Sequence, residues 1–354
     1  MKNRVFQVLV LVLLLAFLVS ACAPAATPAP APQEPAPQEP AAPTEPVAAP
    51  AEKLQVAVIM PSSITDYAFS QSFYEGLLIV QEEMGGPDRL EIAYSENMFN
   101  VPDAAAAIRD YAASGYDIVF AHGSQYGTSL AQIAPDFPET AFAWGTSLDT
   151  FQAQGVTNVH AYQAESQEGG FVLGVIAAHM SESGVVGIAG PVEAGDAKLF
   201  VDGFAAGAQY AKPDIRVNIS YTGSFSDVSL MAAAANTHID AGADMLTGSS
   251  QSVVGAIGVA KDRGAYWFGT QWDQTPIAPE TVVASQIFEW TGVIDDIIDS
   301  HNKGVLGGKA YTLTFKNEGL VLKYNDNVTV SDEIKAAAEA AIQGIMNGEI
   351  DPLP

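Results

Sequence analysis

Aromatic and amide side chains recur in this sequence just after short apolar segments end. Residues 56–60 (V-A-V-I-M) form the first apolar segment, and Asp66, Tyr67, Phe69 and Ser70 follow it. Flat rings bury a large area of a planar ligand at a small entropic cost, while amides and carboxylates fix its orientation. These side chains are suited to binding a small molecule. The other candidates are His122, Gln125, Tyr126, Trp144, Gln251, Gln271, Trp272, Phe288 and Trp290.

Residues that could catalyse a reaction form no recognisable pattern. The five histidines lie far apart, and none has a metal-ligand spacing such as H-E-x-x-H. The G-x-S-x-G nucleophile motif, the Walker loop and the G-x-G-x-x-G fingerprint do not occur in the sequence. We therefore expect a binding protein without a metal or a cofactor. A hydrolase would need a catalytic pair assembled from distant residues.

Alternating strands and helices must position the candidate side chains. Strands are expected at 90–94, 117–121 and 140–144, with helices at 104–111 and 129–134 between them. This alternation predicts a parallel sheet with right-handed crossovers. Ligands of such sheets bind beyond the carboxyl ends of the strands, near helix N-termini. The candidate residues follow strand ends and so fall in that region.

The alternation begins again near residue 168, which predicts a second lobe. The tail is expected to hold a helix at 294–301, a strand pair within 312–324 and a last helix at 331–346. The fold class is therefore α/β, with two lobes that each contain a mainly parallel sheet flanked by helices. The second lobe is expected to have strands at 185–190, 217–221, 245–247, 266–269 and 281–290 and helices at 168–180, 196–210, 230–241 and 252–263.

The first 22 residues have the pattern of a bacterial lipoprotein signal. Lys2 and Arg4 precede an apolar run from Val5 to Val19, and the segment closes with V-S-A-C. The pattern predicts that residues 1–21 are cleaved and that Cys22 receives lipid chains such as palmitate. A transmembrane helix is the alternative, but a run of about 15 residues is short for a bilayer. We expect a lipid anchor on the extracytoplasmic face of the cell membrane.

Composition separates a tether from a folded region. Residues 22–52 consist mostly of Ala, Pro, Gln, Glu and Thr and are expected to be an extended tether, whereas residues 53–354 have a globular composition. The chain has 41 Asp and Glu against 15 Lys and Arg, a net charge of −26. That charge argues against nucleic acid as a partner. A single cysteine excludes an intramolecular disulfide, and we expect a monomer.

Several blocks of the sequence occur together in a known family. Residues 66–77 read D-Y-A-F-S-Q-S-F-Y-E-G-L, and E-G-G-F-V-L-G-V-I-A-A, D-G-F-A-A-G, G-A-D-M and G-T-Q-W-D-Q follow in that order. The first block resembles D-x-x-F-N-Q-x-x-Y-E-G-L of the basic membrane protein (BMP) family. That family consists of substrate-binding lipoproteins related to the purine nucleoside receptor of ABC importers. The resemblance extends from about residue 54 to 347.

The resemblance implies a two-lobed type I periplasmic-binding-protein fold that closes on a nucleoside or related ligand and delivers it to an ABC permease. It also implies that Asp66 and Phe69 contact the base, Phe69 by stacking. Three positions depart from the family pattern. Ser70 stands where Asn is usual, Gln271 replaces an acidic residue that holds ribose hydroxyls, and Phe288 falls near a common ribose-contacting Lys. We therefore expect a purine base or a nucleoside, with sugar recognition altered.

The lobe boundaries follow from the expected elements. The N-terminal lobe should comprise residues 53–160 and 285–306, and the C-terminal lobe residues 161–284 and 307–354. A ligand that touches both lobes would stabilise their closed arrangement. Two other functions stay open, namely a lipid-anchored receptor that feeds a signalling protein and, less favoured, a surface hydrolase.

Overall fold

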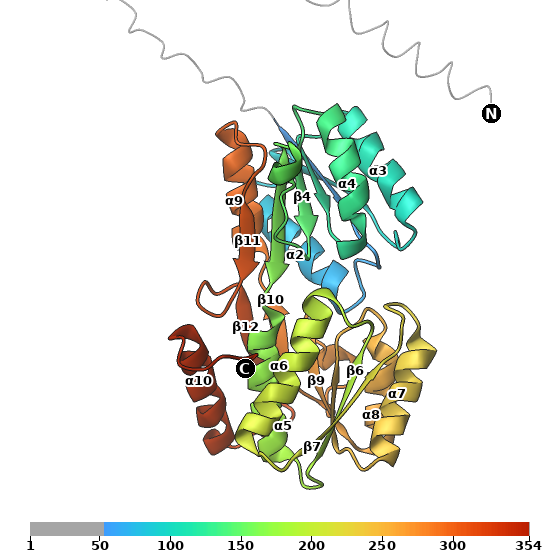
Figure 1. Cartoon of the computed structure of the whole chain (residues 1–354), viewed down its shortest axis with the longest axis vertical. Helices are drawn as coiled ribbons and strands as arrows, with labels where there is room; N and C mark the ends of the chain where they lie inside the picture. The colour runs from blue at the N-terminus through green and yellow to red at the C-terminus, as the bar shows by residue number, and fades with distance from the viewer. Residues whose placement is uncertain (1–52, 354) are drawn as a thin grey trace, which may run out of the picture. The chain divides into compact units, whose positions relative to one another are not determined.

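Residues 53–353, described by a computed structural model, form two α/β lobes (Figure 1). Each lobe contains one six-stranded sheet flanked by helices, as the alternation of strands and helices predicts. The expected signal, tether and lipid-bearing Cys22 lie outside the described residues. None of the described helices is both long enough and apolar enough to cross a bilayer.

The sheet of the first lobe has the strand order β11-β5-β4-β3-β1-β2. All of its pairings are parallel. Its two central strands, β3 and β4, carry no charged or amide side chain, because helices cover both faces of a parallel sheet. The strands are β1 (Leu54–Ile59), β2 (Leu90–Ser95), β3 (Ile118–Ala121), β4 (Ala141–Gly145), β5 (Val159–Ala164) and β11 (Ala310–Leu313).

Local signals in the sequence set where the helices of this lobe begin and pack. The side chain of Asn100 accepts a hydrogen bond from the Asp103 N–H and so caps α3, which has a proline in its first turn. Gly76 lets α2 approach α9, because a Cβ there would lie 3.2 Å from the Cβ of Trp290. The helices are α2 (Phe69–Glu83), α3 (Val101–Ala113), α4 (Gly127–Ile133) and α9 (Thr291–Asn302), with short 3-10 turns at Ser124–Tyr126, Ala134–Asp136 and Gln152–Gln154.

The sheet of the second lobe has the order β12-β10-β9-β8-β6-β7, and only β12 runs antiparallel to its neighbour. The strands are β6 (Val185–Gly190), β7 (Arg216–Tyr221), β8 (Met245–Gly248), β9 (Tyr266–Gln271), β10 (Val282–Phe288) and β12 (Leu320–Tyr324). The helices are α5 (Ser166–Met180), α6 (Gly195–Ala211), α7 (Val228–Asp240), α8 (Val253–Arg263) and α10 (Asp332–Met346), with a 3-10 turn at Thr275–Ile277.

Glycines in two of the sequence blocks of this lobe allow two helices to pack closely. A Cβ at Gly203 or Gly207 of α6 would overlap backbone atoms of α5, and a Cβ at Gly170 or Gly174 of α5 would overlap backbone atoms of α6. The blocks at 168–178 and 202–207 therefore let the two helix backbones pack in direct contact. This contact fixes α6, whose N-terminal end lines the cavity between the lobes.

The chain passes between the sheets three times, and these positions correct the expected tail. A strand pair within 312–324 was the wrong expectation, since β11 joins β5 in the first sheet while β12 joins β10 in the second. Two apolar runs around the turn-like residues 314–319 look like a hairpin, but each finds a partner in a different lobe. The lobe limits also differ from those expected, because β5 extends through Ala164 in the first sheet and β10 through Phe288 in the second.

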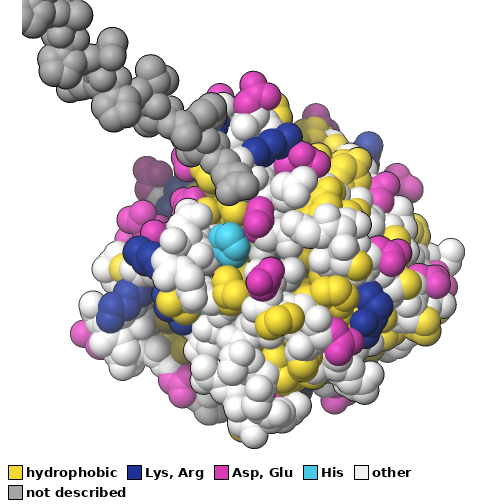
Figure 2. All heavy atoms as spheres, turned by 90° about the horizontal axis from the view of Figure 1, so that it is seen from above, with side chains coloured by type: hydrophobic (Ala, Val, Ile, Leu, Met, Phe, Trp, Pro, Cys, Tyr) yellow, Lys and Arg dark blue, Asp and Glu magenta, His cyan; other side chains and the backbone are white. Residues whose placement is uncertain are grey.

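Acidic side chains are spread over the surface. On the face shown in Figure 2, Asp and Glu lie scattered among neutral and apolar side chains and do not gather in one patch. Such a distribution fits the composition, which gives the chain a net charge of −26. Scattered charge favours solubility and makes binding of a polyanion unfavourable.

Candidate ligand-binding site

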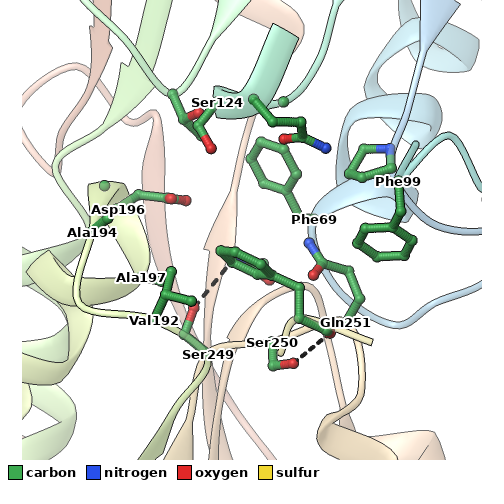
Figure 3. Close-up of a pocket in the computed structure, with 17 residues that line it drawn as sticks. Phe69, Phe99, Ser124, Val192, Ala194, Asp196, Ala197, Ser249, Ser250 and Gln251 are labelled. Carbon is green, nitrogen blue, oxygen red and sulfur yellow. Dashed lines mark hydrogen bonds between the residues drawn. The ribbon is translucent and has the colours of Figure 1, made fainter. Parts of the chain in front are cut away.

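A cavity of about 110 Å³ lies between the two lobes. It is lined by the loops that follow β1, β2, β3 and β4 on one side and β6, β7, β8 and β9 on the other (Figure 3). These are the carboxyl ends of the strands, where open α/β sheets bind ligands.

Phe69 is one of two aromatic residues that the first lobe presents to the cavity, the other being Phe99. Phe69 is the first residue of α2, and only 4% of its surface is exposed. The ring of His122 stacks on the Phe69 ring with a centroid distance of 3.7 Å and an angle of 11°. Trp290 meets Phe69 edge-on at 6.3 Å. Phe69 is therefore a firmly supported flat surface, suited to stacking against a planar ligand.

His122 lies behind Phe69 and does not line the cavity. Its Nε2 is 3.0 Å from the carbonyl oxygen of Phe69, and its Nδ1 is 2.9 Å from the hydroxyl of Tyr162. Because a carbonyl can only accept, Nε2 carries the proton and Nδ1 accepts from Tyr162. Burial lowers the pKa of His122 to about 3, so the ring is neutral. Its role here is to hold the backbone and the ring of Phe69.

Asp66 and Ser70 hold the loop between β1 and α2. The carboxylate of Asp66 accepts hydrogen bonds from the N–H groups of Ala68, Ser70 and Gln71, at 2.8, 3.2 and 3.1 Å. Burial raises the pKa of Asp66 to about 6 although these bonds oppose the shift. The Oγ of Ser70 accepts from the Ser62 N–H at 3.2 Å. Neither side chain lines the cavity, so base recognition by Asp66 stays a prediction.

Two further candidates, Tyr126 and Trp144, support the first wall from outside the cavity lining. Tyr126 is fully buried and its hydroxyl donates to the carbonyl of Met98 at 2.9 Å. Trp144 donates from Nε1 to the carbonyl of Gly123 at 3.1 Å and stacks on Phe151 at 5.0 Å. Both fix loops whose neighbouring residues do line the cavity.

Phe288 and Trp290 belong to the core. They are 2% and 1% exposed, and Trp290 donates from Nε1 to Ser72 Oγ at 3.0 Å. Trp272 is half-buried and does not line the cavity either. The sequence predicts Trp272 just after a strand and Phe288 and Trp290 at the end of one, but how deeply these side chains are buried depends on packing that the strand pattern does not specify.

Tyr67 contributes a backbone contact between the lobes. Its φ is 53°, in the left-handed region, and its carbonyl accepts a hydrogen bond from Gln274 Nε2 at 3.2 Å. Gln274 belongs to the second lobe and is fully buried, with its Oε1 accepting from Trp267 Nε1 at 2.7 Å. This hydrogen bond joins the two lobes beside the cavity.

The side of the cavity that the second lobe forms, called here the second wall, carries most of the polar side chains of the lining. Its predicted members are Gln251 and Gln271, which line the cavity as Gln125 does from the first lobe. The Oε1 atoms of Gln251 and Gln271 are buried and have no hydrogen-bond partner. The φ of Gln271 is 75°, which is rarely adopted by a residue other than glycine, and its Nε2 lies 3.5 Å from Ser249 Oγ. Backbone strain and unpaired polar atoms of this kind cluster at functional sites.

Sequence reasoning missed several lining residues, chiefly Asp196, Phe225 and Phe99. Asp196 lies in the first turn of α6, and burial in the cleft raises its pKa to about 6. Each of the three follows a strand, namely β6, β7 and β2, so the same rule of strand ends applies to them. No run of aromatic or amide residues marks these three loops.

These features define a class of protein. Two α/β lobes enclose a cavity lined by rings, amides and hydroxyls, and residues 53–353 hold no cluster of His, Cys, Asp or Glu that could bind a metal. The arrangement is that of a two-lobed solute-binding protein.

Comparison with known proteins gives the family. Residues 53–351 match the family of ABC transporter substrate-binding proteins described as PnrA-like, and the chain belongs to it. This confirms the resemblance to the BMP family and the expectation of a binding protein rather than an enzyme.

Two relatives and one solved structure illustrate the match. A purine-binding protein of Brucella abortus is 32% identical over 304 residues, covering 85% of this chain and 83% of that protein. The transcriptional activator protein med of Bacillus subtilis is 30% identical over 256 residues, covering 72% and 77%. An ABC transporter solute-binding protein of Aeropyrum pernix superposes with a TM-score of 0.72 at 20% identity, covering 84% and 92%, which supports the fold alone.

Proposed function

We propose that this protein captures a purine, with a free base favoured over a nucleoside, and presents it to an ABC permease from a lipid anchor outside the membrane. The single observation that supports a flat ligand best is the Phe69 ring, which lines the cavity and is stacked on His122 at 3.7 Å. A rigid ring loses little entropy when a planar ligand stacks on it. The Brucella abortus relative is itself named a purine-binding protein.

The residues at the positions expected to contact a ribose favour a free base as the ligand. Gln271 lines the cavity where the family resemblance implies a carboxylate for ribose hydroxyls. Phe288, near the expected ribose-contacting lysine, is 2% exposed and lies in the core. A neutral amide holds a hydroxyl less strongly than a carboxylate does, since charge-assisted hydrogen bonds are roughly twice as strong.

Closure of the two lobes is the proposed mechanism of capture. The walls belong to different lobes, so a ligand that contacts both lowers the free energy of the closed arrangement and not that of an open one. The hydrogen bond from Gln274 Nε2 to the Tyr67 carbonyl, at 3.2 Å, joins the lobes in the same arrangement.

A signalling receptor is the second candidate, because the Bacillus subtilis relative is named a transcriptional activator. The two functions share the binding step and differ in the partner. A permease that is retained on the immobilised, purine-loaded chain supports import, whereas retention of a sensor protein supports signalling.

The binding step is tested with the full chain, purified in mild detergent and stripped of bound ligand. Thermal unfolding is followed with adenine, guanine, hypoxanthine and adenosine, and with glucose and leucine as controls. At a concentration 100 times its Kd, a ligand stabilises by about 2.7 kcal/mol, so a bound purine should raise Tm by several degrees. A shift with glucose or leucine and none with a purine contradicts the proposal.

A further inference from the structure

We propose that the second lobe reads hydrogen-bond donors on the ligand and that Asp196 sets this specificity, so the site selects an unphosphorylated purine that bears an amino group. The inference rests on the proposed function of purine capture and assigns a residue to one edge of the ligand. The polar side chains of the second wall belong to Asp196, Ser249, Ser250, Gln251 and Gln271.

The unpaired buried atoms of this wall are acceptors. Gln251 Oε1 and Gln271 Oε1 are buried without a hydrogen-bond partner, and no donor of a cavity-lining side chain shares that condition within residues 53–353. An unpaired buried polar group costs free energy, which a ligand can recover by supplying the missing donor. The wall therefore fits a ligand edge rich in N–H groups.

Asp196 adds a third acceptor that a glutamine cannot imitate. Its carboxylate lies within the cavity, and Figure 3 shows it pointing toward the space that Phe69 faces. An amide can present either its oxygen or its NH2 group, whereas an ionised carboxylate only accepts. Asp196 therefore requires a hydrogen-bond donor on the ligand edge that it faces. Its hydrogen bonds are of the stronger, charge-assisted kind.

The position of Asp196 is set by the fold and not by an ion pair. It lies in the first turn of α6, and its backbone carbonyl accepts a hydrogen bond from Ser166 Oγ at 2.5 Å. No salt bridge of Asp196 occurs within residues 53–353. Since burial raises its pKa to about 6, a ligand N–H that donates to the carboxylate also offsets the cost of burying its charge.

The charge of the cavity lining excludes phosphorylated ligands. Asp196 is the only ionisable side chain that lines the cavity in the described part of the chain, and no lysine or arginine lines it. A phosphate brought into this space would meet a carboxylate and no compensating cation. A base or an unphosphorylated nucleoside avoids that cost, whereas a nucleotide does not.

The test compares two ligands and two variants of the full chain by isothermal titration calorimetry. Adenine has an exocyclic amino group, and unsubstituted purine has the same ring without it. Asp196→Asn keeps the side-chain size and removes the charge. Asp202→Asn is the matched control, because Asp202 lies on the same helix but pairs with Lys198 and does not line the cavity.

Asp196→Asn should weaken adenine binding roughly 10- to 100-fold and leave unsubstituted purine within about twofold of wild type. Asp202→Asn should change neither. Unchanged adenine binding in Asp196→Asn, or an equal loss for both ligands, overturns the inference. If wild-type protein binds neither ligand nor any other purine, the proposed function itself is contradicted.

A second variant keeps the test decisive if Asp196→Asn does not fold. Gln251→Leu removes one unpaired acceptor and should likewise weaken adenine more than unsubstituted purine. Equal affinities of Gln251→Leu and wild type for adenine overturn the assignment of the second wall as the reader of ligand donors.

Discussion

The two walls of the cavity are built in opposite ways. On the first wall, Phe69 is backed by His122 and Trp290, and the polar atoms of both supporting side chains have partners. On the second wall, Gln251 and Gln271 keep buried oxygens without partners, and the backbone of Gln271 is in the left-handed region. The first wall is complete without a ligand, and the second is not.

This difference separates two tasks of a binding site. A preformed ring holds any flat molecule, because stacking depends on area and little on the pattern of substituents. Unpaired acceptors distinguish ligands by their donors, since a mismatched ligand leaves them unpaired. We infer that Phe69 of the first lobe supplies affinity for a planar ligand, whereas the unpaired acceptors of the second lobe supply specificity and favour closure.

The largest effect is expected from breaking the support of the first wall. Trp290→Ala removes a ring that is 1% exposed and meets Phe69, Phe73, His122 and other rings edge-on or tilted. Loss of a buried Trp costs about 3–5 kcal/mol. Urea unfolding should show a decrease of that size in the free energy of unfolding. A decrease below about 1 kcal/mol would mean that the ring is not part of the support.

Removing the stacking surface itself should weaken the binding of every purine by a similar factor. Phe69→Ala is expected to weaken every purine by about 1–3 kcal/mol, or roughly 5- to 150-fold, whatever its substituents. Phe69→Tyr keeps the ring and is the control. Calorimetric titration of adenine and unsubstituted purine should give equal losses for the two ligands. A loss confined to adenine would contradict the division of tasks between the walls.

The neutral state of His122 predicts a pH dependence of stability. Its pKa is about 3 in the folded chain and near 6.5 when unfolded. The unfolded chain therefore binds a proton that the folded one does not as the pH falls below 6.5. The contribution of His122 is complete above that pH and is lost below it, at up to about 1.4 kcal/mol per pH unit.

The contribution of His122 is measured as the difference in the free energy of unfolding between wild type and His122→Phe. The raised pKa values of Asp66 and Asp196 change stability with the opposite sign, but they do so in both proteins and cancel in the difference. Urea unfolding at pH 7 and pH 5 gives the difference. Parallel pH profiles for the two proteins would show that His122 is not the group responsible.

The smallest effect is expected from a substitution at Gln271 in the second wall. Gln271→Gly relieves a left-handed φ of 75° and removes an unpaired buried oxygen. We expect the free energy of unfolding to rise by about 1 kcal/mol while adenine binding weakens. Thermal unfolding and titration of the same sample report both quantities. A decrease in the free energy of unfolding would mean that the backbone of Gln271 holds no strain that the substitution relieves.

Local patterns in the sequence account for most of the fold. Apolar runs alternating with amphipathic stretches predict the strands and helices of both lobes, because the pattern reflects burial on both faces of a parallel sheet. The partners of β11 and β12 were not predictable in this way. Strand pairing is a contact between distant segments, and two short strands near a turn give the same local signal whether or not they pair.

The site was predictable in part for the same reason. Strand ends identify Phe69, Gln125, Gln251 and Gln271, which do line the cavity. A position at a strand end does not determine how deeply the side chain is buried. Residues that support the wall, such as His122, therefore look the same in sequence as residues that form it. Asp66 shows the ambiguity most clearly, because an acidic residue before a helix can cap the helix or face a ligand, and here its carboxylate caps α2.

The most direct test of the account is to identify the compound that the full chain retains when it is purified gently from its own cells. Denaturing the protein and analysing the released small molecules by mass spectrometry gives the answer without a choice of candidates. The account predicts an unphosphorylated purine that bears an amino group, in near-stoichiometric amount. A sugar, an amino acid or a nucleotide in that role would contradict it.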